Sequence, residues 1–134
     1  MPRDTKGEIR IPADVDNIWK HEEKTAKALA RAGYIVEFIP TNNSNDAKSP
    51  DIFMDDAKWE IKSPTTGKLS AVERNLKKAY RQSENIIFDS QRMARLPDKS
   101  IQKELVKQFS LTKKMKRLLF VNRKREVIDI STLL

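Results

Sequence analysis

Hydrophobic residues recur along this chain with two different periods, one typical of helices and one typical of strands. The helical period predicts three helices, over about residues 14–33, 70–82 and 99–115. Either Asp14 or Asp16 can cap the first helix, and Gly33 suits the left-handed conformation that ends it. Ser70 and Glu73 have the spacing of a capping box at the start of the second helix.

Short runs of β-branched and aromatic residues, bounded by turn-forming residues, predict the strands. They cover residues 34–39, 51–54, 59–62, 85–88, 118–121 and 127–130. Residues 55–58 are expected to join two of these strands as a hairpin turn, and residues 41–50 form a polar loop without periodicity. The third helix is expected to bury Ile101 and Leu105.

The order of these elements predicts one α/β (α+β) domain, in which helices flank a single mixed β-sheet. A chain of 134 residues is long enough for one good core and too short for two. The charged, aperiodic residues 1–13 are expected to be a flexible lead-in, and residues 14–134 the domain.

The composition excludes several classes of protein. The chain has no cysteine, so it forms no disulfide, thiolate zinc site or cysteine nucleophile. No apolar run approaches the length of a membrane span, and the N-terminus lacks the apolar segment of a signal peptide. We therefore expect a soluble chain without a membrane anchor.

The positive charge is concentrated in the second half of the chain. The net charge is +8, of which residues 1–60 carry −3 and residues 61–134 carry +11. Basic surfaces of this kind neutralise the phosphates of nucleic acids, and a local acidic cluster can hold a metal ion. A polyanionic partner, nucleic acid first, is the leading expectation.

One short stretch of the chain combines the residues that phosphodiester chemistry needs. Glu60 and Lys62 share one face of a predicted strand, while Ile61 points into the opposite, buried face. The hairpin folds Asp51 back alongside Glu60, so two carboxylates and an ammonium group converge. Asp55 in the turn, like Asp56 beside it, offers an alternative carboxylate.

Carboxylate and carbonyl oxygens are the ligands that Mg²⁺ and Mn²⁺ prefer. The predicted metal ligands are therefore the side chains of Asp51 and Glu60 and the backbone carbonyl of Ile61, with Zn²⁺ as an alternative ion. Lys62 is expected to stabilise charge on the phosphate, and the bolder role for it is that of general base.

The pattern Pro50-Asp51, eight residues, Glu60-x-Lys62 resembles the signature of the PD-(D/E)XK nuclease superfamily. The resemblance implies a restriction-endonuclease-like fold and a helix before the hairpin that supplies another acidic residue. Glu22 lies on the core-facing stripe of that helix and is the candidate, with Glu23 as the fallback.

A more specific resemblance is to C-terminal tRNA nuclease toxin domains of contact-dependent growth inhibition (CdiA-type) proteins. It extends over about residues 18–90 and is carried by residues 21–23, 33–36, 49–51, 60–64 and 80–82. This resemblance implies a tRNA substrate, delivery into the cytoplasm of a target cell and a cognate immunity protein as partner.

Candidate nucleic-acid-binding residues follow the predicted active site. Ser/Thr groups and Lys68 lie just beyond the strand that carries Lys62, and the resemblance implies a role for Gln82. Two basic clusters, expected at one end of the sheet, complete the set: Lys113, Lys114, Lys116 and Arg117, followed by residues 123–125. Trp19 and Trp59 are expected in the core, and His21, the only histidine, in a surface or packing role.

The sequence therefore predicts a metal-dependent nuclease, with tRNA favoured through the toxin resemblance alone. A DNA endonuclease of the restriction or junction-resolving kind is the first alternative, since nothing in the composition separates RNA from DNA. A non-catalytic nucleic-acid-binding module is the second.

Overall fold

A computed structural model of the chain describes residues 7–13, 15, 18–40 and 51–133. The elements follow one another as β1 (Glu8–Arg10), α1 (Lys20–Arg31), β2 (Ile35–Phe38), β3 (Ile52–Met54), β4 (Ala57–Lys62), α2 (Ser70–Ala79), β5 (Asn85–Asp89), α3 (Asp98–Leu111), β6 (Arg117–Val121), β7 (Val127–Asp129) and the 3₁₀-helix η1 (Ile130–Thr132).

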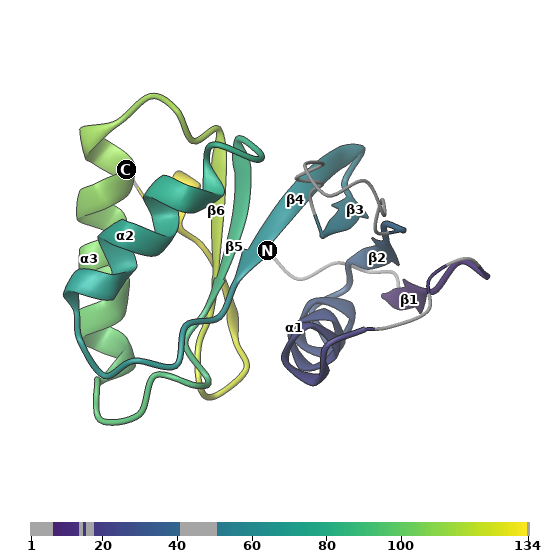
Figure 1. The fold of residues 1–134 in the computed structure, drawn as a ribbon, viewed down its shortest axis with the longest axis horizontal. Coiled ribbons are helices and arrows are strands. Elements are labelled where there is room, and N and C mark those ends of the chain that lie inside the picture. The colour runs from purple at the N-terminus through teal and green to yellow at the C-terminus, as the bar shows by residue number, and fades with distance from the viewer. Residues whose placement is uncertain (1–6, 14, 16–17, 41–50, 134) are drawn as a thin grey trace.

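The seven strands form one mixed sheet in which spatial order follows chain order, from β1 to β7. The pairs β1–β2, β4–β5 and β5–β6 are parallel, whereas β2–β3, β3–β4 and β6–β7 are antiparallel. In Figure 1 the long strand β4 connects the two parts of the sheet, β1–β3 near α1 and β5–β6 near α2 and α3. The predicted single mixed sheet with flanking helices is confirmed.

The sheet separates two hydrophobic cores. Side chains of β5 and β6 alternate between them, so Ile86 and Phe88 pack with α2 and α3 while Ile87 packs with α1. Trp59 and Ile61 of β4 lie in the core under α1, and both are buried. The opposite face of β4, which carries Glu60 and Lys62, is therefore left for polar chemistry.

Helix α1 ends as the sequence predicts. Gly33 has a φ of 101°, in the left-handed region, and its N–H donates to the carbonyl of Ala30 at 3.0 Å. The N–H of Tyr34 donates to the carbonyl of Leu29 at 3.0 Å. These two bonds form a Schellman motif, which satisfies the last carbonyls of the helix and turns the chain into β2.

The β3–β4 hairpin has a two-residue turn, shorter than the predicted turn of residues 55–58, because Ala57 and Lys58 already pair with β3. Asp55 and Asp56 have φ values of 51° and 59°, and Met54 pairs with Ala57 across the turn. Two successive left-handed residues define a type I′ turn, whose twist matches that of the strands, and aspartate tolerates this conformation. The turn fixes the register that pairs Ile52 with Trp59.

The N-terminal part of the chain differs from the prediction. Glu8–Arg10 is not part of a lead-in but an edge strand, which pairs in parallel with β2 and packs Ile9 against the core under α1. Three residues are too few for a periodic pattern, so only the partner strand specifies β1. Helix α1 begins at Lys20, after the extended Trp19, and the predicted caps Asp14 and Asp16 lie outside the described residues.

The other two helices are shorter than predicted. Helix α2 ends at Ala79, and the expected capping box is absent because Leu69, which offers no side-chain cap, precedes the first helical residue. Helix α3 ends at Leu111, since Thr112 is extended and Met115 is buried in the core beside α2. As predicted, Ile101 and Leu105 are buried.

Candidate active site

The end of β4 extends beyond the start of β3, and the polar residues of interest gather there. The N–H of Asp51 donates to the carbonyl of Trp59 at 2.9 Å, which places Asp51 across from Glu60. One carboxylate oxygen of Asp51 accepts a hydrogen bond from the N–H of Ile61 at 2.8 Å. The hairpin thus fixes both the backbone and the side chain of Asp51. Pro50 lies outside the described residues.

Glu60 is a buried carboxylate with one paired oxygen. Its Oε2 lies 3.4 Å from Nζ of Lys62, on the same face of the strand, and its side chain is 5% exposed. Its Oε1 is buried without a hydrogen-bond partner in the part of the chain that the structure describes. A buried oxygen of this kind has lost its water without gaining a donor, which costs free energy unless a ligand or ion approaches it.

Glu22 joins the site from the first turn of α1. It shares a hydrogen bond with Asp51, and the negative charge of Glu60 helps to raise its pKa. Burial, together with the charges of Asp51 and Glu60, raises the pKa of Glu22 to about 7. The fallback candidate Glu23 points elsewhere, because its carboxylate pairs with Lys27 at 3.2 Å on a half-exposed face of the helix.

The other two carboxyl groups are shifted in the same direction. Burial and the charge of Asp51 raise the pKa of Glu60 to about 7, despite the nearby Lys62. Burial also raises the pKa of Asp51, opposed by the Ile61 N–H and the Lys62 ammonium. Three carboxyl groups are thus crowded where water solvates them poorly, and positive charge placed among them would stabilise their ionised forms.

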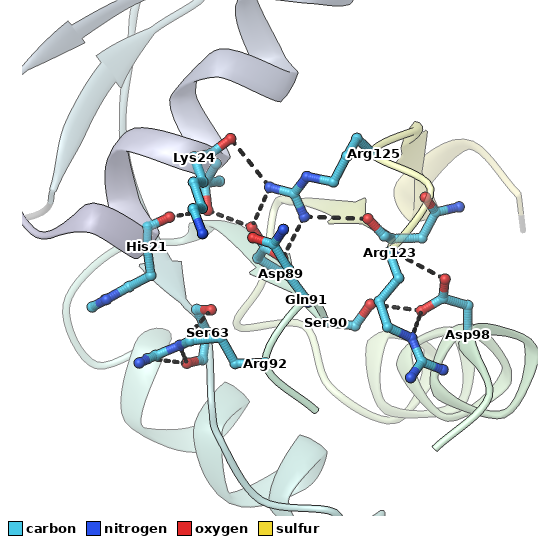
Figure 2. A network of polar contacts seen from close by, with 12 residues as sticks. His21, Lys24, Ser63, Asp89, Ser90, Gln91, Arg92, Asp98, Arg123 and Arg125 are labelled. Atoms are coloured by element: carbon cyan, nitrogen blue, oxygen red, sulfur yellow. Dashed lines mark hydrogen bonds and ion pairs between the residues drawn. The ribbon is translucent and has the colours of Figure 1, made fainter. Parts of the chain in front are cut away.

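These groups line an open, mainly polar hollow of about 410 Å³. Its wall also includes Trp19, His21, Ser63, Pro64, Thr65, Asn75 and Arg92. Arg92 fixes the loop that follows β4, since its guanidinium donates to the carbonyl and the hydroxyl of Ser63 (Figure 2). Neither Asn75, in α2, nor Arg92, after β5, stands in a pattern that would have marked it in the sequence.

The two tryptophans depart from expectation in part. Trp59 is fully buried, as predicted, but Trp19 is 69% exposed and lies against His21 with ring centroids 6.2 Å apart. Trp19 precedes the first turn of α1, and none of the described helices and strands covers its ring. Burial and the charge of Arg92 lower the pKa of His21.

The alternative carboxylates of the turn lie away from this hollow. Asp55 and Asp56 are at the opposite end of β4 from Lys62, about 13 Å along the strand from Glu60 at the usual rise per residue. Asp55 forms an ion pair with Arg117 at 3.3 Å. The structure therefore brings Glu22, Asp51, Glu60 and Lys62 together, and Asp55 and Asp56 do not belong to this site.

The two predicted basic clusters do not share one end of the sheet, because the lysines before β6 lie near the starts of the parallel strands, whereas residues 123–125 follow β6 at the end that carries Lys62. Lys62 and Asp89 end β4 and β5, whereas Lys113, Lys114 and Lys116 precede β6 and Gln82 precedes β5. These residues lie near the starts of the strands, opposite to the carboxylates. Lys68 is exposed in the loop that leaves the site after β4. Lys114 lies over the ring of Tyr80, with Nζ 5.5 Å from the ring centroid.

The arginines of the two predicted basic clusters form contacts within the protein. The Arg117 guanidinium lies 4.8 Å from the centroid of the Trp59 ring and also contacts Asp55 and Asp129. Arg125 binds both oxygens of Asp89 at 2.9 Å (Figure 2). Arg123 contacts Asp98 and the carbonyls of Met93 and Leu96. We interpret these three arginines as structural.

The Asp89–Arg125 pair also ties α1 to the sheet. Asp89 is 1% exposed at the end of β5, and its Oδ2 accepts a hydrogen bond from the hydroxyl of Thr25 in α1. Arg125 adds a bond to the carbonyl of Lys24 at 3.1 Å. Since Thr25 follows Glu22 by three residues, the same face of the helix is fixed where Glu22 enters the site.

The donor set is suited to a hard divalent cation. Among the described residues, no three His, Cys, Asp or Glu side chains are arranged so that they could hold a metal ion by themselves. Mg²⁺ is commonly bound by one or two carboxylates, with water and substrate phosphate as the other ligands. Asp51, Glu60 with its unpaired oxygen, and the carbonyl of Ile61 fit this mode, because the N–H and C=O of a strand residue face the same edge.

Comparison with known proteins identifies the family. The family model for the contact-dependent growth inhibition CdiA C-terminal domain matches residues 48–127, which include Asp51, Glu60 and Lys62 but not Glu22. The chain therefore belongs to this family, and the resemblance to CdiA-type toxin domains is confirmed at this level. The match reaches further along the chain than the sequence resemblance, which was expected to end near residue 90.

A solved structure shows the same fold. It is described as the CdiA-CT/CdiI toxin and immunity complex from Burkholderia pseudomallei, and a chain of it superposes with a TM-score of 0.66 at 15% identity. The likeness covers 90% of this chain and 97% of that one. A search of curated proteins gives no match. Within the described ranges, no helix combines the length and the hydrophobicity needed to cross a membrane.

Proposed function

We propose that this domain is a metal-dependent nuclease toxin of the PD-(D/E)XK type, with tRNA as its favoured substrate. The observation that carries the proposal is the gathering of Glu22, Asp51 and Glu60 beside Lys62 in one polar hollow. Carboxylates that repel each other while partly buried are costly to a fold, and a functional cation is the simplest reason to assemble them.

The residues divide the chemistry between them. Asp51, Glu60 and the Ile61 carbonyl would hold Mg²⁺ or Mn²⁺, which when bound supplies charge stabilisation on the phosphate and a lowered pKa for water. The Lys62 ammonium, beside Glu60, stabilises negative charge that develops on the phosphate. Glu22 would serve as a further acidic ligand beside Asp51, and the ion would offset the repulsion from Asp51 and Glu60 that helps to raise its pKa to about 7 in the metal-free protein.

The substrate and the partner are inferred from family and charge. The chain carries a net charge of +8, which favours a polyanion, and the related structure from Burkholderia pseudomallei is a complex of a toxin with its immunity protein. We accordingly expect a cognate immunity protein, acidic where it meets the basic surface, and action in the cytoplasm of a target cell after delivery.

The test is incubation of the purified domain with total tRNA and, separately, with plasmid DNA, each with Mg²⁺, Mn²⁺ or EDTA. Cleavage of tRNA that requires the metal supports the proposal. Cleavage of DNA alone would replace it with a restriction-type or junction-resolving endonuclease. Binding of nucleic acid without cleavage of either would replace it with a non-catalytic module.

A further inference from the structure

A second hollow adjoins the carboxylate site. It measures about 370 Å³ and is lined by Lys20, His21, Lys24, Gln91 and Arg92. His21 and Arg92 belong to the walls of both hollows, which are therefore contiguous. In Figure 2 the side chains of His21 and Arg92 extend toward the same side of the molecule. Whatever occupies the second hollow lies next to a phosphate held among Asp51, Glu60 and Lys62.

The charge of this hollow is entirely positive. Lys20 and Lys24 stand one turn apart on α1, and Arg92 comes from the loop after β5. None of the three forms an ion pair with a carboxylate within the described ranges. Three arginines of the C-terminal half, Arg117, Arg123 and Arg125, are by contrast held by Asp55, Asp98 and Asp89. Cations that no described carboxylate neutralises, and that face one hollow, are an arrangement that binds phosphate, although two nitrogens of Arg92 also donate to Ser63.

An exposed aromatic ring lines the carboxylate hollow and contacts His21, which belongs to both hollows. Trp19 lines the carboxylate site, is 69% exposed, and is stacked on His21 at an interplanar angle of 26°. His21 supports one face of the indole, and the 69% exposure leaves the other face open to a ligand. A flat, exposed indole beside a cationic hollow is the platform on which unpaired nucleobases stack.

We propose that Trp19, Lys20, Lys24 and Arg92 form a subsite for the nucleotide next to the bond that is cut. Lys20, Lys24 and Arg92 bind its phosphate, and its base stacks on Trp19. Since a base can reach the indole only when it is unpaired, the subsite selects a single-stranded or splayed segment over a continuous duplex. This inference rests on the proposed nuclease function for the placement of the cut, but the binding can be measured without any cleavage.

The experiment uses the full chain with Glu60→Gln in EDTA and follows tryptophan fluorescence during titration with a single-stranded RNA hexanucleotide. Trp59 is fully buried, so quenching reports on Trp19. We expect the hexanucleotide to quench the emission, and the same hexanucleotide in a duplex to quench it much less. Trp19→Ala and Trp19→Phe remove the reporting indole, so their binding is followed through the fluorescence anisotropy of an end-labelled hexanucleotide. Trp19→Ala should weaken binding about tenfold, the usual effect of losing one stacked base, and Trp19→Phe should retain part of the affinity.

The phosphate contacts are tested by Lys20→Gln with Lys24→Gln. The matched control is Lys103→Gln with Lys107→Gln, which removes two exposed lysines at the same spacing from α3. Only the first pair should weaken binding, and it should reduce the salt dependence of the logarithm of affinity by about 0.7 per phosphate released. Equal effects of the two pairs, or equal quenching by the duplex, would overturn the subsite.

The two proposals fail separately. If wild-type protein cleaves nucleic acid but the hexanucleotide leaves Trp19 unquenched, the subsite is wrong and the nuclease stands. If the hexanucleotide quenches Trp19, and this binding depends on Lys20 and Lys24, while no nucleic acid is cleaved, the subsite stands and the domain is a binding module.

Discussion

The N–H of Ile61 donates a hydrogen bond to the carboxylate of Asp51 at 2.8 Å, which joins the start of β3 to the end of β4. This bond fixes Asp51 opposite Glu60 through the backbone of the hairpin. It also occupies only one oxygen of Asp51. The acidic group is therefore preorganised by the hairpin itself, and a substitution that keeps the acceptor but removes the charge separates chemistry from folding.

Glu22→Gln should lower activity by less than substitutions on β4, because water can replace a peripheral carboxylate. Glu23→Gln is the control, since Glu23 pairs with Lys27 on a half-exposed face. Initial cleavage rates and melting temperatures of both variants decide the assignment. Full activity of Glu22→Gln with altered stability would show that Glu22 is structural, and a larger loss in Glu23→Gln would reverse the choice.

The raised carboxyl pKa values predict that the metal-free protein loses stability as the pH rises. The pKa of Glu22 and Glu60 is about 7 in the folded protein against 4.5 for the ordinary group. Between these values the unfolded chain binds fewer protons than the folded chain, so the free energy of unfolding falls with pH. The penalty is absent below pH 4.5 and complete above about pH 7.

A divalent cation should offset this penalty, because it replaces the protons that the carboxyl groups otherwise keep. Mg²⁺ or Mn²⁺ should therefore raise the melting temperature by a few degrees at about pH 8 and by much less at about pH 5. Differential scanning calorimetry with and without EDTA measures the effect, and Glu60→Gln should reduce it. The same increase in melting temperature at both pH values would indicate that the cation binds elsewhere on the protein.

Arg125→Met should destabilise the fold by about 3–5 kcal/mol, because it leaves the buried carboxylate of Asp89 without its charged partner. The neighbouring Lys124→Met removes the same charge from an exposed position and should change the free energy of unfolding little. Urea unfolding measures both variants. A loss below about 1 kcal/mol for Arg125→Met would place this pair among ordinary surface ion pairs.

The lysines before β6 should contribute affinity rather than chemistry. Removing Lys113, Lys114 and Lys116 together should reduce the salt slope of tRNA binding by roughly 0.7–0.9 for each phosphate that the protein no longer neutralises, with turnover at saturation unchanged. The control removes Lys99, Lys103 and Lys107 from α3. If both triple variants bind equally well, the cluster before β6 is only a solvated surface.

Much of the fold was predictable because its signals are local. Gly33 predicts the Schellman end of α1, and the turn that includes Asp55 and Asp56 predicts the hairpin. The three-residue strand β1 was not predictable, since its hydrogen bonds come from β2, 27 residues further along. The exposure of Trp19 was missed for a similar reason: a tryptophan favours burial, and its 69% exposure depends on how distant described elements pack rather than on its own sequence neighbours.

The part of the candidate site that depends on the alternation of side chains along one strand was predictable. Glu60 and Lys62 share a face because Ile61 must be buried, and Asp51 follows from the hairpin register. The choice of Glu22 over Glu23 needed the packing of α1. Arg92 carries no local pattern, and Arg117 and Arg125 appear in the sequence as free cations, although long-range carboxylates hold them in the fold.

The most direct test of the account is the rate of tRNA cleavage by Asp51→Asn protein in Mg²⁺. Asparagine keeps an acceptor for the Ile61 N–H but removes the charge, and Asp56→Asn makes the same change in the distant turn, where asparagine tolerates the positive φ. We predict that Asp56→Asn protein cleaves at the wild-type rate and that wild-type cleavage stops in EDTA. Asp51→Asn should lose at least about a hundredfold in rate with its melting temperature kept, and adding Lys62→Ala should cost little more, since these groups act as a unit. Cleavage that persists in EDTA, or in Asp51→Asn protein, would contradict a metal-dependent site at these carboxylates.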